Sequence, residues 1–380
     1  MKAYRIPFNR PSFAGNEARY IAEAIDRGHI SGDGHFTKRC HELLEKALGV
    51  RKVLLTTSCT HALEMCGLLL DMAPGDEFVV PSFAFVTTVN AFALRGARPA
   101  FVDVRPDTLN LDERAIEARL SPRTKAIVVL HYAGVACEMD PILELAAKRG
   151  IPVVEDNAHG LFGKYRGRFL GTLGALATQS FHETKNLNCG EGGALLVNDA
   201  RHVERAEILR EKGTDRSRFL RGLVHKYEWV DLGSSYLPSE LLAAYLLAQL
   251  EAREAIQSHR RRVWERYALE LADWAKERGV SLPSVPAHCE QPWHIFHMLA
   301  PSTAWREAFI RHLEARGILA VFHYLPLHVS PMGRRFGGRE GDCPVAEDVA
   351  SRIVRLPLYN RLSDAEQGEV IDAVASFAGP

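Results

Sequence analysis

The stretch "IPVVEDNAHG", residues 151–160, places a short apolar run directly before two acids. Its core, Pro152–Asp156, is typical of a strand that is buried on both faces of a parallel sheet, because its side chains are apolar up to the acids. Helical patterns lie between this run and similar ones, for example over His61–Leu70 and Asp140–Arg149. The other runs predicted as strands are Lys52–Thr56, Glu77–Pro81, Ala100–Val104, Ala126–His131, Ala177–Phe181 and Ala194–Asn198. This alternation predicts an α/β layer with a mainly parallel central sheet and helices on both faces.

The pattern changes after Gly233. Residues Pro238–Gly279 are predicted as a long helix, and the "RRR" run within it is interpreted as a solvated face because acids flank it. Further helices and short strands are expected at Thr303–Arg316, Asp364–Phe377, Ile295–Leu299 and Ala320–His323. We therefore predict a large α/β domain over residues 1–245 and a smaller α+β domain over residues 246–380.

Composition excludes several classes of function. The 380 residues include 47 Lys plus Arg and 47 Asp plus Glu, so a broad nucleic-acid or anionic-membrane footprint is not expected. The start, "MKAYRIPFNRPSFAG", lacks the apolar core of a signal peptide, and no apolar run approaches the roughly 20 residues of a membrane span. The seven cysteines are scattered without a C-x-x-C pair, which favours reduced thiols in a cytoplasmic protein.

Ligands of parallel sheets bind beyond the carboxyl ends of the strands. The first predicted strand leads into "TTSCTHAL", residues 56–63, where Ser58, Cys59 and Thr60 stand at the start of a helix. Backbone N–H groups at such a place bind phosphate, although an ordinary helix N-cap is the alternative.

Two further strand ends carry ionisable groups. Asp156 could hold a protonated pyridine nitrogen, or it could find a structural arginine or a backbone cap. Lys185, in "SFHETKN", could be a solvated lysine or a lysine of lowered pKa that forms a Schiff base.

No metal site is predicted. "HETKN" lacks the second histidine of a zinc-peptidase motif, since position 186 is Asn. His131, His159 and His182 could cluster in space, but no carboxylate stands at ligand spacing.

The three strand ends together fit one cofactor. Pyridoxal 5′-phosphate (PLP) requires a phosphate cradle, an acid on its ring nitrogen and a lysine for its aldehyde. The sequence offers these at residues 58–60, 156 and 185. The conjunction favours Lys185 as a Schiff-base residue.

The ordered motifs resemble the sugar-nucleotide aminotransferases of the DegT/DnrJ/EryC1/StrS family, from about Ile6 to the end of the chain. They are "PGDEFVVPSFAFVTTVNAF", "FVDVRPDTLNLD", "HYAGVACEMDPI", "VVEDNAHG", "SFHETKN", "GEGG" and "HYLPLH". The resemblance implies a PLP-dependent transferase of fold type I that acts as a homodimer with shared active sites. It also implies transamination of dTDP-4-keto-6-deoxy-D-glucose with L-glutamate as donor, of the kind found in enterobacterial common antigen biosynthesis.

The resemblance also assigns roles to residues. Lys185 would bind the PLP aldehyde and Asp156 its pyridine nitrogen, while His159 stands near the ring hydroxyl. The remaining cofactor contacts would be Phe85, stacked on the ring, and Ser58, Cys59, Thr60 and Ser180 at the phosphate.

Two other segments receive roles. Ser235, in "GSSYLPS", stands where many relatives have an Asn that reaches the phosphate of the neighbouring subunit. His323, Tyr324 and His328 of "HYLPLH" are expected to line the sugar site, with buried and satisfied side chains as the alternative. Gly190, Gly192 and Gly193 are expected to form a turn near the cofactor or a plain connection.

The sequence leaves three other functions to compare: amination of another sugar nucleotide, sugar dehydration and binding without catalysis. The chain could aminate a different keto-sugar nucleotide, at another position or with other stereochemistry. Relatives that dehydrate their sugar lack the lysine, so Lys185 argues against that activity. A non-catalytic binding protein would not need the complete set of cradle, acid and lysine.

Overall fold

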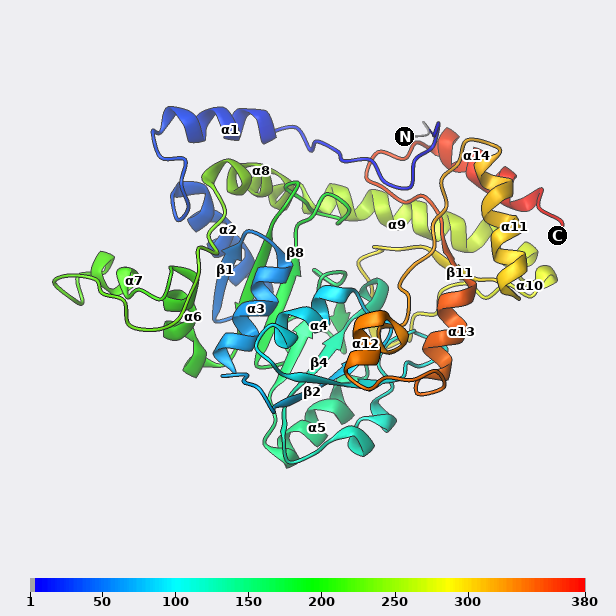
Figure 1. Ribbon diagram of the computed structural model, residues 1–380. Helices are drawn as coiled ribbons and strands as arrows, with labels where there is room; N and C mark the ends of the chain where they lie inside the picture. The colour runs from blue at the N-terminus through cyan, green and yellow to red at the C-terminus, as the bar shows by residue number, and fades with distance from the viewer. Residues whose placement is uncertain (1–3, 380) are drawn as a thin grey trace.

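The computed structural model describes residues 4–379 and is built on a seven-stranded sheet of order β1-β9-β8-β5-β4-β2-β3 (Figure 1). The strands are β1 Lys52–Thr56, β2 Glu77–Pro81, β3 Arg98–Val102, β4 Thr124–Leu130, β5 Val153–Asp156, β8 Leu176–Ser180 and β9 Gly193–Val197. β9 runs antiparallel to both of its neighbours, and the other adjacent pairs are parallel. The predicted mainly parallel sheet is confirmed.

Helices cover both faces of this sheet. The large part of the molecule contains α1 Glu17–Asp26, α2 His35–Leu48, α3 Cys59–Leu69, α4 Val86–Ala93, α5 Met139–Arg149, α6 Val203–Arg210, α7 Arg216–Leu220 and α8 Glu240–Glu251. Neighbouring residues of β4 show the two faces: Val128 packs in the core of α3 and α4, whereas Ile127 and Val129 pack in the core of α5. Burial on both faces explains why the strands are almost wholly apolar.

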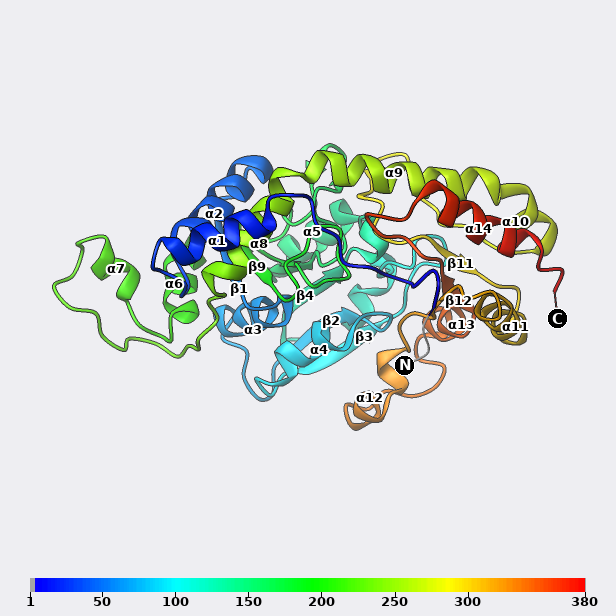
Figure 2. The ribbon, with the colours of Figure 1, turned by 90° about the horizontal axis from the view of Figure 1, so that it is seen from above.

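The remaining elements form the second part of the chain. They are α9 Arg253–Glu270, α10 Ala272–Arg278, β10 Cys289–Glu290, β11 His297–Leu299, α11 Thr303–Glu314, α12 Pro331–Arg335, α13 Pro344–Arg352, β12 Ile353–Arg355 and α14 Asp364–Ala375. β6 Lys164–Tyr165 and β7 Arg168–Phe169 join β10 in a small sheet. Seen from above, α9 runs along the molecule from α8 towards α10 and α14 (Figure 2).

The prediction of one long helix over Pro238–Gly279 is wrong. The backbone leaves helical geometry at Ala252 and Leu271, which separates α8, α9 and α10. α8 packs against α1 and α2, and Ile256 at the start of α9 still belongs to their core, whereas Val263 and Tyr267 further along α9 pack in the second core. The strand expected at Ala320–His323 is only a bridge between Val321 and Arg355, which lies on β12.

The second hydrophobic core gathers side chains from Val263 to Phe377, together with Ile6. Ile6 reaches it through backbone hydrogen bonds with Gly317 and Leu319, so the start of the described chain lies against the second part. The boundary at residues 245 and 246 falls inside α8 and stays a prediction.

Candidate active site

The predicted strand ends meet at one edge of the sheet. Thr56 and Ser180, the last residues of β1 and β8, both pair with Gly193, the first residue of β9. Asp156 ends β5 beside Thr178 of β8. The carboxyl ends of three parallel strands therefore surround the start of the antiparallel strand.

The start of α3 forms an anion site at this edge. The Ser58 hydroxyl caps the helix by accepting from the His61 N–H at 3.1 Å, so the N-cap alternative holds for its side chain. The N–H groups of Cys59 and Thr60 belong to the first turn, where a helix offers no acceptor. Their dipoles and the helix terminus favour an anion such as a phosphate.

Gly193 lets the backbone approach this turn closely. A Cβ added to Gly193 would meet the Ser58 carbonyl oxygen at 2.5 Å and would lie closer still to the Cys59 nitrogen. Gly190 has φ +84° and open space around its α-carbon. Gly193 therefore allows close packing against the anion site, whereas Gly190 allows the turn.

The two acids of "VVED" have different surroundings. Glu155 is fully buried and satisfied: it accepts from the His131 ring at 2.9 Å and from the backbone N–H groups of Gly171, Leu173 and Gly174. Asp156 accepts from the Thr88 hydroxyl at 2.6 Å and from the Ala158 N–H at 3.2 Å. Of the alternatives that the sequence left open for Asp156, no structural arginine lies within hydrogen-bond distance among the described residues, whereas the Ala158 N–H supplies a backbone cap to one carboxylate oxygen.

Burial raises the pKa of Asp156, and the Thr88 hydroxyl, the Ala158 N–H and the charge of Lys185 act in the opposite direction. A carboxylate in this state is stabilised by a cation placed against it. A protonated pyridine nitrogen supplies such a cation.

Lys185 lies in the same pocket as His159 and Ser180. Burial lowers its pKa to about 8, and Cys59 and Asp156 partly oppose that shift. A lysine of this pKa is a nucleophile near neutral pH, which a solvated lysine is not.

Aromatic and histidine rings cluster beside these strand ends and form a wall of the site. The Tyr324 hydroxyl lies 3.2 Å from Nε2 of His159, and the Tyr132 hydroxyl lies 2.6 Å from Nδ1 of His323. The His294 ring lies against that of His159 in a tilted arrangement, with 4.6 Å between ring centroids. Burial lowers the pKa of His159, His294 and His323 well below the usual histidine value, so these rings are neutral at physiological pH.

The structure places Phe85, Ser235 and His328 outside the cluster of residues around Lys185. Phe85 is 53% exposed and its ring centroid lies 6.1 Å from that of Tyr324, beside the site. Ser235 is exposed, and its backbone bridges to Glu211 at the end of α6. His328 is fully buried, and its ring nitrogens are bonded to Ser82 at 2.5 Å and Glu347 at 2.9 Å, so the buried and satisfied alternative describes it.

Several residues at the site were missed from the sequence. They are Thr88, Tyr132, His294, His297 and Arg355. Thr88 and Tyr132 follow strand ends, which could have singled them out. His294, His297 and Arg355 come from the second part of the chain and carry no local signal.

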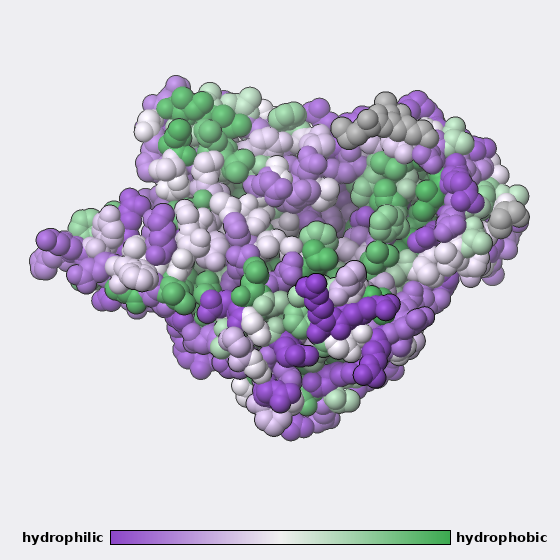
Figure 3. Space-filling model, viewed as in Figure 1, coloured by the Kyte–Doolittle hydropathy of each residue, from purple (hydrophilic) through white to green (hydrophobic). Residues whose placement is uncertain are grey.

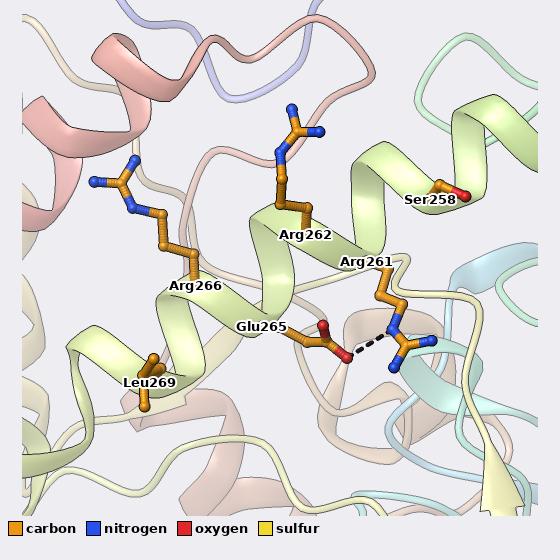
Figure 4. A pocket seen from close by; sticks show the side chains of 6 residues that line it. All are labelled: Ser258, Arg261, Arg262, Glu265, Arg266 and Leu269. Atoms are coloured by element: carbon orange, nitrogen blue, oxygen red, sulfur yellow. Dashed lines mark hydrogen bonds and ion pairs between the residues drawn. The ribbon is translucent and has the colours of Figure 1, made fainter.

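Other surface features do not resemble a site. The hollow on α9 is lined by Ser258, Arg261, Arg262, Glu265, Arg266 and Leu269, whose side chains point away from the helix in several directions (Figure 4). Arg261 and Arg262 confirm a solvated face, but the prediction is wrong for Arg260, which is 2% exposed. In residues 4–379 no group of three His, Cys, Asp or Glu side chains could hold a metal, and no helix is long and apolar enough to cross a membrane.

The three groups at the sheet edge also fit together chemically. A helix terminus takes a phosphate, a buried carboxylate takes a ring cation, and a lysine of lowered pKa takes an aldehyde. One small molecule carries all three partners, so the fold and the site define the class of PLP-dependent transferases of fold type I.

The chain belongs to the DegT/DnrJ/EryC1/StrS aminotransferase family, whose model matches residues 11–375. GDP-perosamine synthase of Escherichia coli O157:H7 is 31% identical over 376 residues, which are 98% of each chain. The structure of the aminotransferase TlmJ from Streptoalloteichus hindustanus superposes with a TM-score of 0.89 at 33% identity, covering 99% of this chain and 98% of that one. The PMP-form of Spr1654 from Streptococcus pneumoniae has a TM-score of 0.91 at 25% identity and 98% coverage of both chains.

These findings confirm the family, the fold class and the cofactor expected from the sequence. The protein is a PLP-dependent sugar aminotransferase.

Proposed function

We propose that the protein transfers an amino group from L-glutamate to dTDP-4-keto-6-deoxy-D-glucose, giving dTDP-4-amino-4,6-dideoxy-D-galactose and 2-oxoglutarate. The observation that carries the chemistry is Lys185, with a pKa lowered to about 8, in one pocket with His159 and Ser180. The choice of sugar nucleotide rests on the sequence motifs.

Bound PLP would supply an electron-withdrawing ring that stabilises negative charge on the carbon next to the transferred nitrogen. Lys185 would hold the aldehyde carbon covalently and, once displaced by the donor, its Nζ would move the proton as general base and acid. Its lowered pKa suits both tasks, because a neutral amine is needed to accept the proton.

Asp156 would keep the ring nitrogen protonated. The Thr88 hydroxyl and the Ala158 N–H fix both carboxylate oxygens, which leaves the group oriented for a single further partner. The N–H groups of Cys59 and Thr60, with Ser180, would hold the phosphate at the opposite end.

His159, His323 and Tyr324 would bound the sugar side of the site. Because His159 is neutral, one of its ring nitrogens accepts while the other donates. Nδ1 accepts from the Ala133 N–H at 3.3 Å, so the proton lies on Nε2, which faces the Tyr324 hydroxyl. Phe85 would cover the ring from the exposed side.

The active enzyme would be a homodimer with shared sites. Residues around α7 project from the body of the molecule (Figure 1) and expose apolar side chains. These are Phe219, Leu220, Leu223, Tyr227, Trp229, Val230 and Leu232. A second exposed apolar surface lies at α1 (Figure 3), with Phe13, Ile25 and Ile30. Large apolar side chains exposed in this number favour a protein–protein contact, and Ser235, which follows them in the chain, would reach the partner's phosphate.

We also propose a cytoplasmic location. All seven cysteines are free, and six of them are buried. Reduced cysteines persist in a reducing compartment.

A second candidate substrate is a GDP-linked sugar, because GDP-perosamine synthase matches almost the whole chain at 31% identity. It differs from the first proposal in the base and in the sugar, and not in the chemistry at Lys185.

The test is product analysis by NMR after incubation of the PLP-loaded enzyme with L-glutamate and one keto-sugar nucleotide at a time. We expect the 4-amino galacto product from dTDP-4-keto-6-deoxy-D-glucose, and slower turnover with its 3-keto isomer and with the GDP-linked 4-keto sugar. Faster amination of either alternative would replace the proposed substrate, and absence of amination in all three would contradict the proposed function.

A further inference from the structure

Arg355 reaches the active site from the second part of the chain. It ends β12, where it pairs with His297 of β11 on one side and with Val321 on the other. Residues directly opposite one another in an antiparallel pair share a face, so Arg355 and His297 point the same way. The His297 ring lies 5.6 Å from that of Tyr132, which belongs to the wall of the site.

The charge of Arg355 acts on the whole site. Burial is the main cause that lowers the pKa of Lys185 and of the histidines His159, His294, His297 and His323, and the charge of Arg355 acts in the same direction. This agrees with the strand pairing that sets Arg355 opposite His297.

The guanidinium has donors to spare. Nε and Nη2 both donate to the Phe322 carbonyl, at 3.3 and 3.0 Å, and the group lies 4.6 Å from the centre of the Phe8 ring. Within residues 4–379 no carboxylate pairs with the Arg355 guanidinium. Arg352, three residues earlier, forms a bidentate ion pair with Asp348. Desolvation lowers the pKa of Arg355, although the residue keeps part of its surface exposed, so a ligand that enters from solvent can reach the guanidinium.

The amino donor of the proposed reaction carries a carboxylate that matches the charge of Arg355. An amino acid donor carries its α-carboxylate on the same carbon as the amino group that reacts near Lys185. Arginine binds carboxylates through parallel N–H bonds, which fix the orientation of the bound group. The neutral histidines around it offer hydrogen bonds but no competing charge.

We propose that Arg355 binds the α-carboxylate of the amino donor and thereby orients the donor carbon towards Lys185. This inference rests on the proposed function, since it assigns the donor subsite of the same reaction. The diphosphate of the sugar nucleotide is the other anion present, and the two half-reactions separate the two ligands.

The test compares wild type with Arg355→Gln, Arg355→Lys and the control Arg262→Gln, which removes an exposed charge from α9. The donor half-reaction is followed by absorbance with L-glutamate and the PLP-loaded enzyme. The acceptor half-reaction uses the pyridoxamine-phosphate form and the keto-sugar nucleotide. Binding of the unreactive donor analogue 2-methylglutamate is measured by calorimetry.

We expect Arg355→Gln to weaken glutamate and 2-methylglutamate binding about 30- to 100-fold, the effect of losing charged hydrogen bonds. The acceptor half-reaction should change less than about threefold, Arg355→Lys should recover part of the loss, and Arg262→Gln should match wild type.

A selective loss in the acceptor half-reaction would assign Arg355 to the diphosphate and overturn the inference. Equal losses in both half-reactions, with a lower melting temperature, would also overturn it, because they indicate a structural role. If the wild type aminates no sugar nucleotide, the proposed function fails, and the binding of 2-methylglutamate still reports on Arg355 by itself.

Discussion

Lys185 is the residue on which the chemistry depends, and its pKa makes a testable statement about pH. A lysine of pKa about 8 is neutral in about one molecule in ten at pH 7, whereas an ordinary lysine is neutral in fewer than one in a thousand. The neutral fraction grows as pH rises and reaches its plateau above the pKa. The rate of covalent PLP attachment to the apoprotein should therefore rise about tenfold per pH unit and level off above about pH 8.

Attachment is measured by borohydride trapping followed by peptide mass mapping. Lys185→Ala should remove the label and the turnover while the melting temperature of the apoprotein stays high. A rise that continues to pH 10, or a label on another lysine, would contradict the assignment.

Thr88 is expected to support the charge of Asp156. Its hydroxyl donates to Asp156 at 2.6 Å, and it is one of the groups that hold the pKa of that carboxyl down. Thr88→Val should raise the pKa of Asp156 further and weaken its charge on the ring nitrogen. We expect PLP binding to weaken about tenfold, since a hydrogen bond to a charged group is lost.

The matched control is Thr87→Val, one residue earlier, for which no side-chain hydrogen bond is observed. Spectroscopic titration of the apoproteins with PLP measures both. Equal affinity of Thr88→Val and wild type would show that Asp156 is oriented without Thr88.

The residues that were predicted from the sequence share one property. Asp156, Lys185 and the first turn of α3 each follow a buried strand, so the general rule for parallel sheets was enough to bring them together. Arg355 comes to the site from the second part of the chain, and packing of that kind leaves no local pattern, whereas Thr88 follows the end of β2 and could have been singled out. For His328 the sequence could not decide between the sugar site and the interior, because that depends on Ser82 and Glu347.

The start of β9 packs very closely against the start of α3, where Gly193 meets the backbone of Ser58 and Cys59. Gly193→Ala would press a methyl group against the peptide between Ser58 and Cys59. The anion site would have to shift, so we expect a loss of about 3 kcal/mol of stability and a matching loss of affinity for PLP.

Gly368→Ala in α14 is the control. Its added Cβ has no neighbour closer than 3.6 Å, and alanine favours a helix interior by about 1 kcal/mol over glycine. Denaturant unfolding and PLP titration should show a stable, fully binding Gly368→Ala. A Gly193→Ala variant of normal stability and affinity would mean that the turn tolerates the methyl group.

α9 offers a comparison between adjacent arginines. Arg260 is buried and donates to the carbonyls of Trp293 and His294 at 3.1 and 2.7 Å, and to the Asn360 side chain at 2.9 Å. Arg261 forms an exposed pair with Glu265. Arg260→Ala should cost about 3 kcal/mol, because it leaves buried carbonyls without donors. Arg261→Ala should change stability by no more than about 0.5 kcal/mol.

Denaturant midpoints measure the difference. Because Arg260 holds the His294 carbonyl, its loss should also weaken PLP binding. Similar costs for the two variants would contradict the role given to the buried guanidinium.

Sequence patterns predicted the strands of the large sheet to within two residues, because burial on both faces makes them plainly apolar. The prediction failed where helices follow one another without a glycine or proline. At Ala252 the helix is interrupted before α9 continues from the core of α8 into the second core, and no residue type marks that interruption. β12 was missed because Ile353–Arg355 is short and acquires its partner β11 from more than fifty residues away.

Across the whole molecule, the two cores are tied together around the site. Leu327 and Cys343 pack in the core of α3 and α4, although they belong to the second part of the chain. The Asp103 carboxylate accepts from the N–H groups of Val345 and Ala346 at the start of α13. Groups on the second part, such as His323 and Arg355, are thereby held against the sheet edge, which favours a site of fixed geometry.

If the homodimer shares its active sites, two inactive variants that affect different subunits should restore activity when they are combined. Ser235→Glu would place a carboxylate against the partner's phosphate site, and the repulsion should abolish PLP binding and activity. In a heterodimer of Lys185→Ala and Ser235→Glu, one site carries both changes and the other carries neither. Two-tag purification of the coexpressed subunits should yield heterodimers with about half of the wild-type activity, although each parent is inactive. The heterodimer of Lys185→Ala with Asp156→Asn is the control. Each change affects only its own subunit's site, so no intact site forms and the activity should be about half that of the Asp156→Asn homodimer. Absence of recovery in the Ser235 pair, or a fully active monomer in sedimentation, would contradict the shared site.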